Sequence, residues 1–366
     1  MTKNISVVLV AGSRPEIIKL SELAKVYCKD DQSCIVYTGQ HYSYNMRDKF
    51  LDELGVKIDY DLGCGTSVPS HLVNEIGRLF NDLKPEYVIV YGDTNSTMAA
   101  AIAAKQMNSK LIHIEAGLRS FDLAMIEERN RIYIDSISDF LLSPTHLSKL
   151  FLQYEGITDR VFITGNLIVD VCRKYSEKIR NSIASIQGFG KEYLLLTLHR
   201  PETVDRPMLL KKLMKQLAAV GYDIVLPIHP RTKNNLAKYN ISIPSNVFML
   251  PPQGYLEFLG LLSRSILVLT DSGGVQEESV ILKKPCITLR SSTERQETLL
   301  IKANKLFPIG YENSSLVNAI DEMVDTKITV NPYGENVTER TVKTIISIVE
   351  ESKKLVTLQS RVVQAK

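Results

Sequence analysis

Residues 265–281, SILVLTDSGGVQEESVI, combine residue types that suit anion binding. A short run of Ile, Leu and Val ends at Asp271, and Ser272, Gly273 and Gly274 follow before a segment that can form a helix. Such a junction presents free backbone N–H groups and the positive end of a helix dipole. The glycines let a bulky anion approach the main chain. The segment predicts a phosphate or diphosphate site, although a plain strand-to-helix turn has the same pattern.

Eight polar residues come shortly after segments that are typical of buried strands. They are Arg14, Gln40, His41, Asp93, Glu115, His199, His229 and Asp271. Ligands of doubly wound sheets bind beyond the carboxyl ends of the strands, so we expect these residues to line a cleft. Taken singly, Asp93 and Asp271 could instead be helix N-caps. We assign structural roles to His71, His113 and His146, and expect His113 to be buried because it alternates with apolar residues.

The side-chain types favour acid–base chemistry beside a diphosphate. Arg14, His199 and Arg295 could bind the anion together with residues 272–274, since arginine makes paired hydrogen bonds to phosphate.

Three carboxylates, Asp93, Glu115 and Glu127, could transfer protons near that anion. Burial and mutual repulsion raise the pKa of carboxyl groups, which suits a general acid or base. Glu127 and Arg131 are four residues apart on a predicted helix, so an ordinary surface ion pair is the alternative for them.

Signatures of other chemistries are missing from the sequence. The first strand is not followed by GxGxxG, and there is no GxxxxGK[ST], HExxH, GxSxG or paired Cys/His spacing. Nicotinamide, P-loop and metal chemistry are therefore disfavoured. Nucleotide-sugar transfer or epimerisation remains.

Composition indicates a globular protein of two domains. The chain has 366 residues, of which 44% are hydrophobic and 23% charged, with a net charge of +3. This charge gives no sign of a nucleic-acid or membrane partner, and no apolar run reaches membrane-spanning length. The five cysteines lack CxxC spacing, which predicts free thiols in a reducing cytoplasm.

Strand and helix patterns alternate along both halves of the chain. Predicted strands cover residues 5–11, 33–37, 86–91, 110–114, 140–143, 160–164, 193–198, 222–228, 246–250, 265–270 and 285–289. The alternation predicts two α/β domains, each a doubly wound parallel sheet, with a boundary within residues 166–175. The helical stretch after about residue 336 is long enough to return to the first domain.

Eleven sequence blocks follow one another along nearly the whole chain: GSRPEIIKL, TGQHY, YGDTNST, HIEAGLRSFD, EERNR, TGN, LTLHRPE, IHPRT, PQGYLEF, LTDSGGVQEE and TERQET. This series resembles the non-hydrolysing UDP-N-acetylglucosamine 2-epimerases. The resemblance implies the GT-B architecture, with two Rossmann-like domains facing a central cleft. The expected domains are 1–168, joined by a returning helix at about 350–366, and 169–349. The resemblance also implies a cytoplasmic homodimer.

The same resemblance implies reversible inversion at C2 of UDP-GlcNAc to give UDP-ManNAc. The family is thought to eliminate UDP across C1–C2 to a 2-acetamidoglucal, to which UDP adds back on the other face. The product would supply ManNAc-type sugars for surface polysaccharide. This chemistry requires no redox cofactor and no metal.

Matched by motif, Asp93, Glu115 and Glu127 correspond to the three catalytic carboxylates, and His199 would help UDP to depart. The residues expected to bind UDP or the sugar are Arg14, Lys19, Gln253, Phe258, Ser272, Gly273, Gly274, Glu278 and Arg295. Among these, Gln253 and Phe258 would hold the uracil, and Glu278 would accept from the ribose hydroxyls.

Gln40, His41 and His229 match positions where some bacterial members bind a second UDP-GlcNAc as an activator. The chain departs from the family pattern at Ile126 and Gln296, which usually are prolines, at Thr203, which usually is Asn, and after Gly65. These departures argue against activation by a second substrate molecule.

Four other activities remain as alternatives. They are 2-epimerisation of a UDP-2,3-diacetamido uronic acid, a hydrolysing epimerase, a GT-B glycosyltransferase and a nucleotide-sugar sensor. The three carboxylates, without an evident acceptor-binding insertion, argue against the last two.

Overall fold

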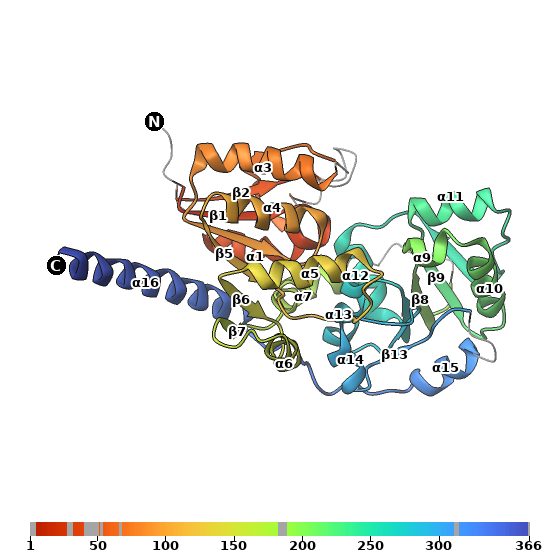
Figure 1. Ribbon diagram of the computed structural model, residues 1–366. Coiled ribbons are helices and arrows are strands. Elements are labelled where there is room, and N and C mark those ends of the chain that lie inside the picture. The colour runs from red at the N-terminus through yellow and green to blue at the C-terminus, as the bar shows by residue number, and fades with distance from the viewer. Residues whose placement is uncertain are drawn as a thin grey trace. The chain divides into compact units, whose positions relative to one another are not determined.

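The computed structural model describes residues 5–27, 32–39, 51, 54–65, 68–181, 189–310 and 315–364, without the side chains of 180, 181, 353 and 355–364. The chain divides into two compact units (Figure 1). Unit 1 comprises Met1–Leu118, Leu123–Val171 and Tyr333–Lys366, and unit 2 comprises Arg119–Asp122 and Cys172–Pro332.

Unit 1 is built on a sheet with the strand order β3-β2-β1-β4-β5-β6-β7, in which every pair is parallel. The strands are β1 (Val7–Ala11), β2 (Ser33–Tyr37), β3 (Tyr60–Asp61), β4 (Tyr87–Tyr91), β5 (Lys110–Ile114), β6 (Phe140–Ser143) and β7 (Val161–Ile163). The helices are α1 (Arg14–Tyr27), α3 (Pro69–Leu83), α4 (Asn95–Gln106), α5 (Ile126–Ile137), α6 (His146–Tyr154), α7 (Ile168–Lys174) and α16 (Val337–Gln364).

Unit 2 repeats the plan with the parallel order β10-β9-β8-β11-β12-β13. The strands are β8 (Tyr193–Thr197), β9 (Asp223–Pro227), β10 (Val247–Leu250), β11 (Leu267–Thr270), β12 (Cys286–Thr288) and β13 (Asn304–Leu306). The helices are α8 (Ser176–Asn181), α9 (Pro201–Val204), α10 (Pro207–Ala218), α11 (Pro230–Lys238), α12 (Tyr255–Arg264), α13 (Gly273–Ile281), α14 (Gln296–Leu300) and α15 (Leu316–Met323). The last three residues of α7 also belong to unit 2.

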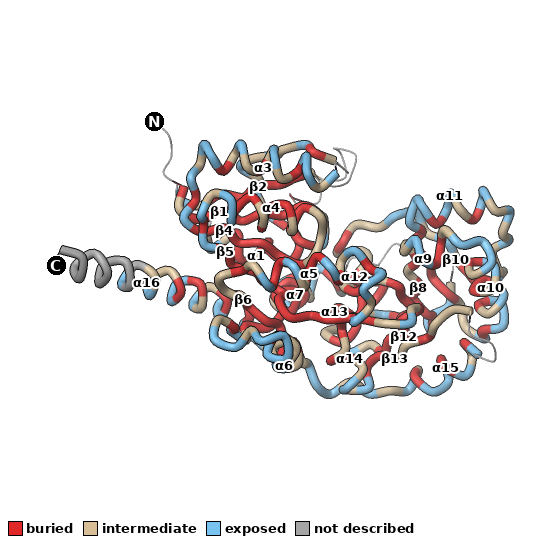
Figure 2. The backbone as a smooth tube through the Cα atoms, viewed as in Figure 1, coloured by how far each residue is buried: buried red, intermediate tan, exposed pale blue. Residues whose placement is uncertain are grey.

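The central strands are continuous apolar runs because helices cover both of their faces. All five residues of β1 and of β4 are buried, and Figure 2 shows both strands in the colour of buried backbone. On α3, Leu72, Ile76 and Phe80 recur every four residues and form one buried stripe. Five alanines are among the seven buried residues of α4, so this helix can pack closely in unit 1.

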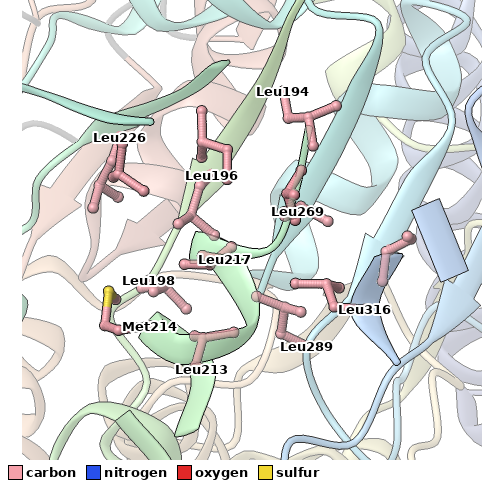
Figure 3. Close-up of a cluster of buried hydrophobic side chains, with 14 of the residues drawn as sticks. Leu194, Leu196, Leu198, Leu213, Met214, Leu217, Leu226, Leu269, Leu289 and Leu316 are labelled. Carbon is pink, nitrogen blue, oxygen red and sulfur yellow. The ribbon is translucent and has the colours of Figure 1, made fainter. Parts of the chain in front are cut away.

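Alternation along β8 divides the core of unit 2 between the two faces of its sheet. Leu194 and Leu196 pack in one cluster with Leu213 and Leu217 of α10 (Figure 3). Leu195 lies in a second cluster that includes residues of α12 and α13. Burial on both faces makes β8 rigid, and its carboxyl end is therefore a firm base for polar side chains.

All eleven predicted strands are present, with ends that differ by at most two residues. Two short strands, β3 and β13, were not predicted because they have no apolar run long enough to stand out. The returning helix α16 is in the same unit as α1, and the Tyr27 hydroxyl donates to the Val342 carbonyl at 3.4 Å.

Candidate active site

Each sheet has one point where the strand order reverses, and the polar residues gather there. In unit 1 this point lies between β1 and β4, whose carboxyl ends lead to Arg14 and Asp93. In unit 2 it lies between β8 and β11, which lead to His199 and Asp271. Chains leaving neighbouring strands in opposite directions open a crevice at such a point. The topology of each sheet therefore brings the polar residues of its own unit together.

Asp93 is held by the helix α5. Its Oδ2 accepts from Arg131 Nε at 2.8 Å, and its backbone carbonyl accepts from the Asn130 amide at 2.9 Å. The Arg131 side chain is only 2% exposed and also pairs with the fully buried Glu128. The N-cap of α4 is Thr94, so the N-cap alternative for Asp93 is wrong. Arg131 is buried and does not lie on the surface.

Glu115 lies beside Lys19 in the same unit. Lys19 Nζ donates to Glu115 Oε1 at 2.6 Å, and both side chains are at least nine-tenths buried. The Tyr91 hydroxyl is 3.5 Å from the same oxygen. Glu115 has φ +74°, a left-handed conformation that is costly for a residue with a Cβ. Lys19, which was predicted to bind UDP, is here the direct partner of a predicted catalytic carboxylate.

Arg14 begins α1 and is partly buried, and Glu127 is partly buried in the first turn of α5. Ile126, in place of the usual proline, is the first residue of α5 and is 54% exposed.

Glu16 was not singled out from the sequence, yet it closes the turn after β1. Its carboxylate accepts from the backbone amides of Gly12 and Ser13 at 2.5 and 2.9 Å and from the Thr97 hydroxyl at 3.0 Å. Burial raises the pKa of Glu16, and these hydrogen bonds offset only part of that effect. An acid soon after a proline at a helix start was the available signal.

The buried pair His113–Asp135 connects the turns that carry the two carboxylates. His113 Nε2 lies 2.8 Å from the carbonyl oxygen of Gly92, next to Asp93. Its Nδ1 lies 2.7 Å from Asp135 Oδ1, while the other Asp135 oxygen accepts from the Gly117 amide at 3.1 Å. His113 is fully buried, as predicted. His71 and His146 are exposed.

In unit 2, Asp271 orients His199. His199 Nδ1 lies 2.8 Å from Asp271 Oδ1, and Asp271 Oδ2 accepts from the backbone amides of His199 and Arg200 at 2.8 Å each. Burial raises the pKa of the Asp271 carboxyl, but the His199 charge and these hydrogen bonds outweigh burial and leave it below 3.8. The N-cap alternative is wrong here too, because Ser272 occupies the N-cap of α13.

The small residues after Asp271 form the start of α13. Ser272 makes no side-chain cap hydrogen bond, and no heavy atom comes within 4 Å of a Cβ built on Gly274. A Cβ on Gly273 would lie 2.1 Å from Glu294 Oε1, so a side chain there would force Glu294 to move. Gln276 accepts from the Thr293 hydroxyl at 2.7 Å and thereby ties α13 to the segment before Arg295.

Arg295 is 4% exposed and its Nε lies 2.5 Å from Oε1 of Glu277, which is fully buried. Glu277 was not predicted, since it adjoins Glu278 in a sequence that does not distinguish the two. Gln296, in place of the usual proline, donates to the Arg119 carbonyl at 2.9 Å. Thr203 is buried in α9.

Gln253 and Phe258 flank the start of α12. The Gln253 amide donates to the Pro251 carbonyl at 2.7 Å, and Phe258 packs on the core cluster beneath α12. Glu278 is 7% exposed and accepts from the Tyr255 hydroxyl at 3.0 Å.

His229 caps α11, and its ring centroid is 5.8 Å from that of His199. The structure therefore puts this predicted activator residue beside the predicted diphosphate residue of unit 2. Gln40 and His41 lie outside the described residues.

The part of the chain that the structure describes contains neither a recognisable metal site nor a membrane-spanning helix. There, no three His, Cys, Asp or Glu side chains are grouped so as to hold a metal ion. No helix in the same part is long and apolar enough to cross a bilayer.

Comparison with known proteins identifies the family. The sequence profile described as UDP-N-acetylglucosamine 2-epimerase matches residues 27–347. The chain belongs to this family. The UDP-N-acetylglucosamine 2-epimerase of Methanocaldococcus jannaschii is 41% identical to this epimerase-family chain over 347 residues, covering 89% of this chain and 94% of the relative.

A second relative is named as a 2-epimerase of another UDP-sugar. The UDP-2,3-diacetamido-2,3-dideoxy-D-glucuronate 2-epimerase of Pseudomonas aeruginosa is 38% identical over 317 residues, which are 82% of this chain and 88% of the relative. A crystal structure of the M. jannaschii UDP-GlcNAc 2-epimerase with UDP-GlcNAc and UDP has a TM-score of 0.87 at 37% identity, covering 94% of this chain and all of that one. The predicted fold class, a GT-B type with two parallel-sheet α/β domains, is confirmed.

Proposed function

We propose that this protein interconverts UDP-GlcNAc and UDP-ManNAc by inverting C2 of the sugar. One observation carries the proposal: a chain of this family holds Asp93 and Glu115 at the carboxyl ends of adjacent strands, each paired with a buried cation. Two carboxylates with different partners can take different roles in proton transfer.

In the proposed reaction one carboxylate removes the C2 proton while the C1–O bond breaks. The electron pair of the C–H bond forms the C1–C2 double bond of 2-acetamidoglucal, and the pair of the C1–O bond leaves with UDP. Re-addition of UDP to C1, with a proton delivered to the opposite face of C2, gives the epimer. Asp93, Glu115 and Glu127 share these transfers, and Lys19 and Arg131 fix the first two.

Residues of unit 2 serve the nucleotide in this proposal. His199, oriented by Asp271, donates to the departing diphosphate. The amides at residues 272–274 and the Arg295 guanidinium bind the diphosphate, as α13 begins with uncapped N–H groups. Arg14 also contacts UDP, and residues 253 and 258 contact the uracil. The three catalytic carboxylates then belong to domain 1–168, and most of the UDP-binding residues belong to domain 169–349.

The direct test is incubation with UDP-GlcNAc in D₂O, followed by NMR. We expect UDP-ManNAc with deuterium at C2. Asp93→Asn, Glu115→Gln and Glu127→Gln should abolish turnover while UDP still binds. Glu75→Gln, which changes a carboxylate paired with Arg78 at the surface of the same unit, is the matched control and should be fully active. A folded, UDP-binding protein that forms no epimer would refute the proposal.

The same NMR experiment resolves the finer questions. Free UDP and ManNAc accumulating together would indicate a hydrolysing epimerase instead of the non-hydrolysing enzyme that we propose. UDP-2,3-diacetamido-2,3-dideoxy-D-glucuronate deserves a parallel incubation, because a relative named for it is 38% identical to this chain. We further propose a cytoplasmic homodimer that supplies ManNAc-type sugars for polysaccharide and needs no cofactor. Ultracentrifugation tests the dimer.

A further inference from the structure

A buried tyrosine that no catalytic role requires lies against Glu278. Tyr255, the first residue of α12, donates its hydroxyl hydrogen to Glu278 Oε1 at 3.0 Å. Tyr255 is 4% exposed and Glu278 is 7% exposed, so little water reaches the hydrogen bond between them. A carboxylate has about four acceptor sites, and one hydrogen bond to a fixed donor restricts its rotation without exhausting them.

The Tyr255 hydroxyl keeps its hydrogen near neutral pH and therefore remains a hydrogen-bond donor. Burial, and then the nearby charge of Glu278, raise the pKa of Tyr255 well above its ordinary value. Behind it, the Cys172 side chain from α7 contacts the phenolic oxygen, and burial followed by the charge of Glu278 raises the pKa of this thiol too. The S–H group can donate to the phenolic oxygen, which leaves the phenolic hydrogen for Glu278.

We propose that Tyr255 is a positioning residue that makes the nucleotide site select ribose over 2′-deoxyribose, by holding the Glu278 carboxylate in the orientation that accepts from the ribose hydroxyls. The inference rests on the proposed function, in which Glu278 meets the ribose. A site built to pair a substrate hydroxyl rejects an analogue without it, since a buried polar group then loses its partner. The penalty arises only if the Glu278 carboxylate cannot rotate towards another partner, and the hydrogen bond from Tyr255 restrains that rotation.

Isothermal titration with UDP and with 2′-deoxy-UDP tests the proposal. A hydrogen bond to a charged group contributes about 1.5–3 kcal/mol, so the wild type should bind UDP about 10- to 150-fold more tightly than 2′-deoxy-UDP. Tyr255→Phe should lower this ratio about tenfold, through weaker UDP binding alone. Tyr193→Phe is the matched control, because Tyr193 donates to the Leu261 carbonyl of the same helix at 2.6 Å and should not affect the ratio.

Two further variants keep the test decisive. Glu278→Gln should reduce the ratio as Tyr255→Phe does, and the double variant should be little worse than either one, since the two residues act as a unit. An unchanged ratio in Tyr255→Phe, or equal weakening of both nucleotides, would overturn the inference while the proposed function stands. Should Tyr255→Phe not fold, an unchanged ratio in Glu278→Gln overturns it. A wild type that binds neither nucleotide overturns both.

Discussion

Replacing Asp271 by Asn isolates the electrostatic part of the His199 site. The amide has the shape of the carboxylate and can still accept from the two backbone amides that Asp271 binds at 2.8 Å. Its NH₂ group, however, cannot accept from His199 Nδ1, which lies 2.8 Å from the carboxylate in the native protein. We therefore expect the imidazole to lose its preferred tautomer as well as the neighbouring negative charge.

The size of the effect follows from burial. Asp271 is fully buried, which strengthens its pairing, but the His199 side chain is 38% exposed, and solvent there screens the interaction. From the range of about 1.5–3 kcal/mol for a hydrogen bond to a charged group we take the lower end. About 1.5 kcal/mol corresponds to about a tenfold lower kcat. The Kd of UDP should rise less, because the backbone amides of residues 272–274, which we propose bind the diphosphate, are unchanged.

The pH dependence of this variant has a definite sign. Since the pKa of Asp271 is lowered from 3.8 in the folded protein, its stabilisation is fully present above that value and is lost as pH falls through the folded pKa. The Asp271 carboxylate of the wild type should thus stay ionised between about pH 5 and 8, where it differs in charge from the neutral amide of Asp271→Asn. The difference in their free energies of unfolding should shrink only in stronger acid. Circular dichroism suits the unfolding measurement, as the chain has no Trp.

The assay compares initial epimerisation rates of the wild type, Asp271→Asn and a matched Asp205→Asn control. Asp205 is an exposed carboxylate of unit 2 that pairs with Arg231 at 2.6 Å, so its loss should leave kcat unchanged. A normal kcat in Asp271→Asn, with UDP binding intact, would refute the assignment of an orienting role to this carboxylate. An equal loss in both variants would point to a non-specific charge effect.

Three other substitutions test how unit 1 positions its carboxylates. Asp135→Asn should lower kcat by about tenfold or more, with an unchanged Kd for UDP, because the NH₂ group that replaces one carboxylate oxygen cannot accept a hydrogen bond from His113. Equal changes in kcat and Kd would contradict this. Gly117→Ala should cost about 2–5 kcal/mol of stability, because φ is +82° and its Cβ would lie 2.3 Å from a carbonyl oxygen, whereas Gly77→Ala, in open space, should not destabilise the protein. Lys19→Met should cost about 3–5 kcal/mol of stability, because it removes the cation paired with the buried Glu115 carboxylate. Adding Glu115→Gln should restore part of this loss, and an additive double variant would argue against the pair.

Eleven strands and two doubly wound parallel-sheet domains could be predicted from the sequence. Parallel strands buried on both faces leave unbroken apolar runs, and the polar residues after them stand out against those runs. The local sequence pattern did not show whether Asp93 and Asp271 cap a helix or pair with a charged side chain, because aspartate is common in both roles. The roles of Glu16 and Glu277 were missed for different reasons: the proline before Glu16 was a signal that was not used, whereas Glu277 adjoins Glu278 and cannot be told from it by sequence.

The sequence by itself determined which residues gather at the strand ends, since periodicity and small-residue turns are local properties. Only the tertiary structure decided which charges are paired, because partners such as Lys19 and Glu115 or Arg295 and Glu277 lie far apart in the chain. The order of the strands in the sheets brings these residues close together, and burial strengthens the electrostatic attraction between them. Tyr255 acquires its place beside Glu278 in the same way, through the packing of α12 on α13.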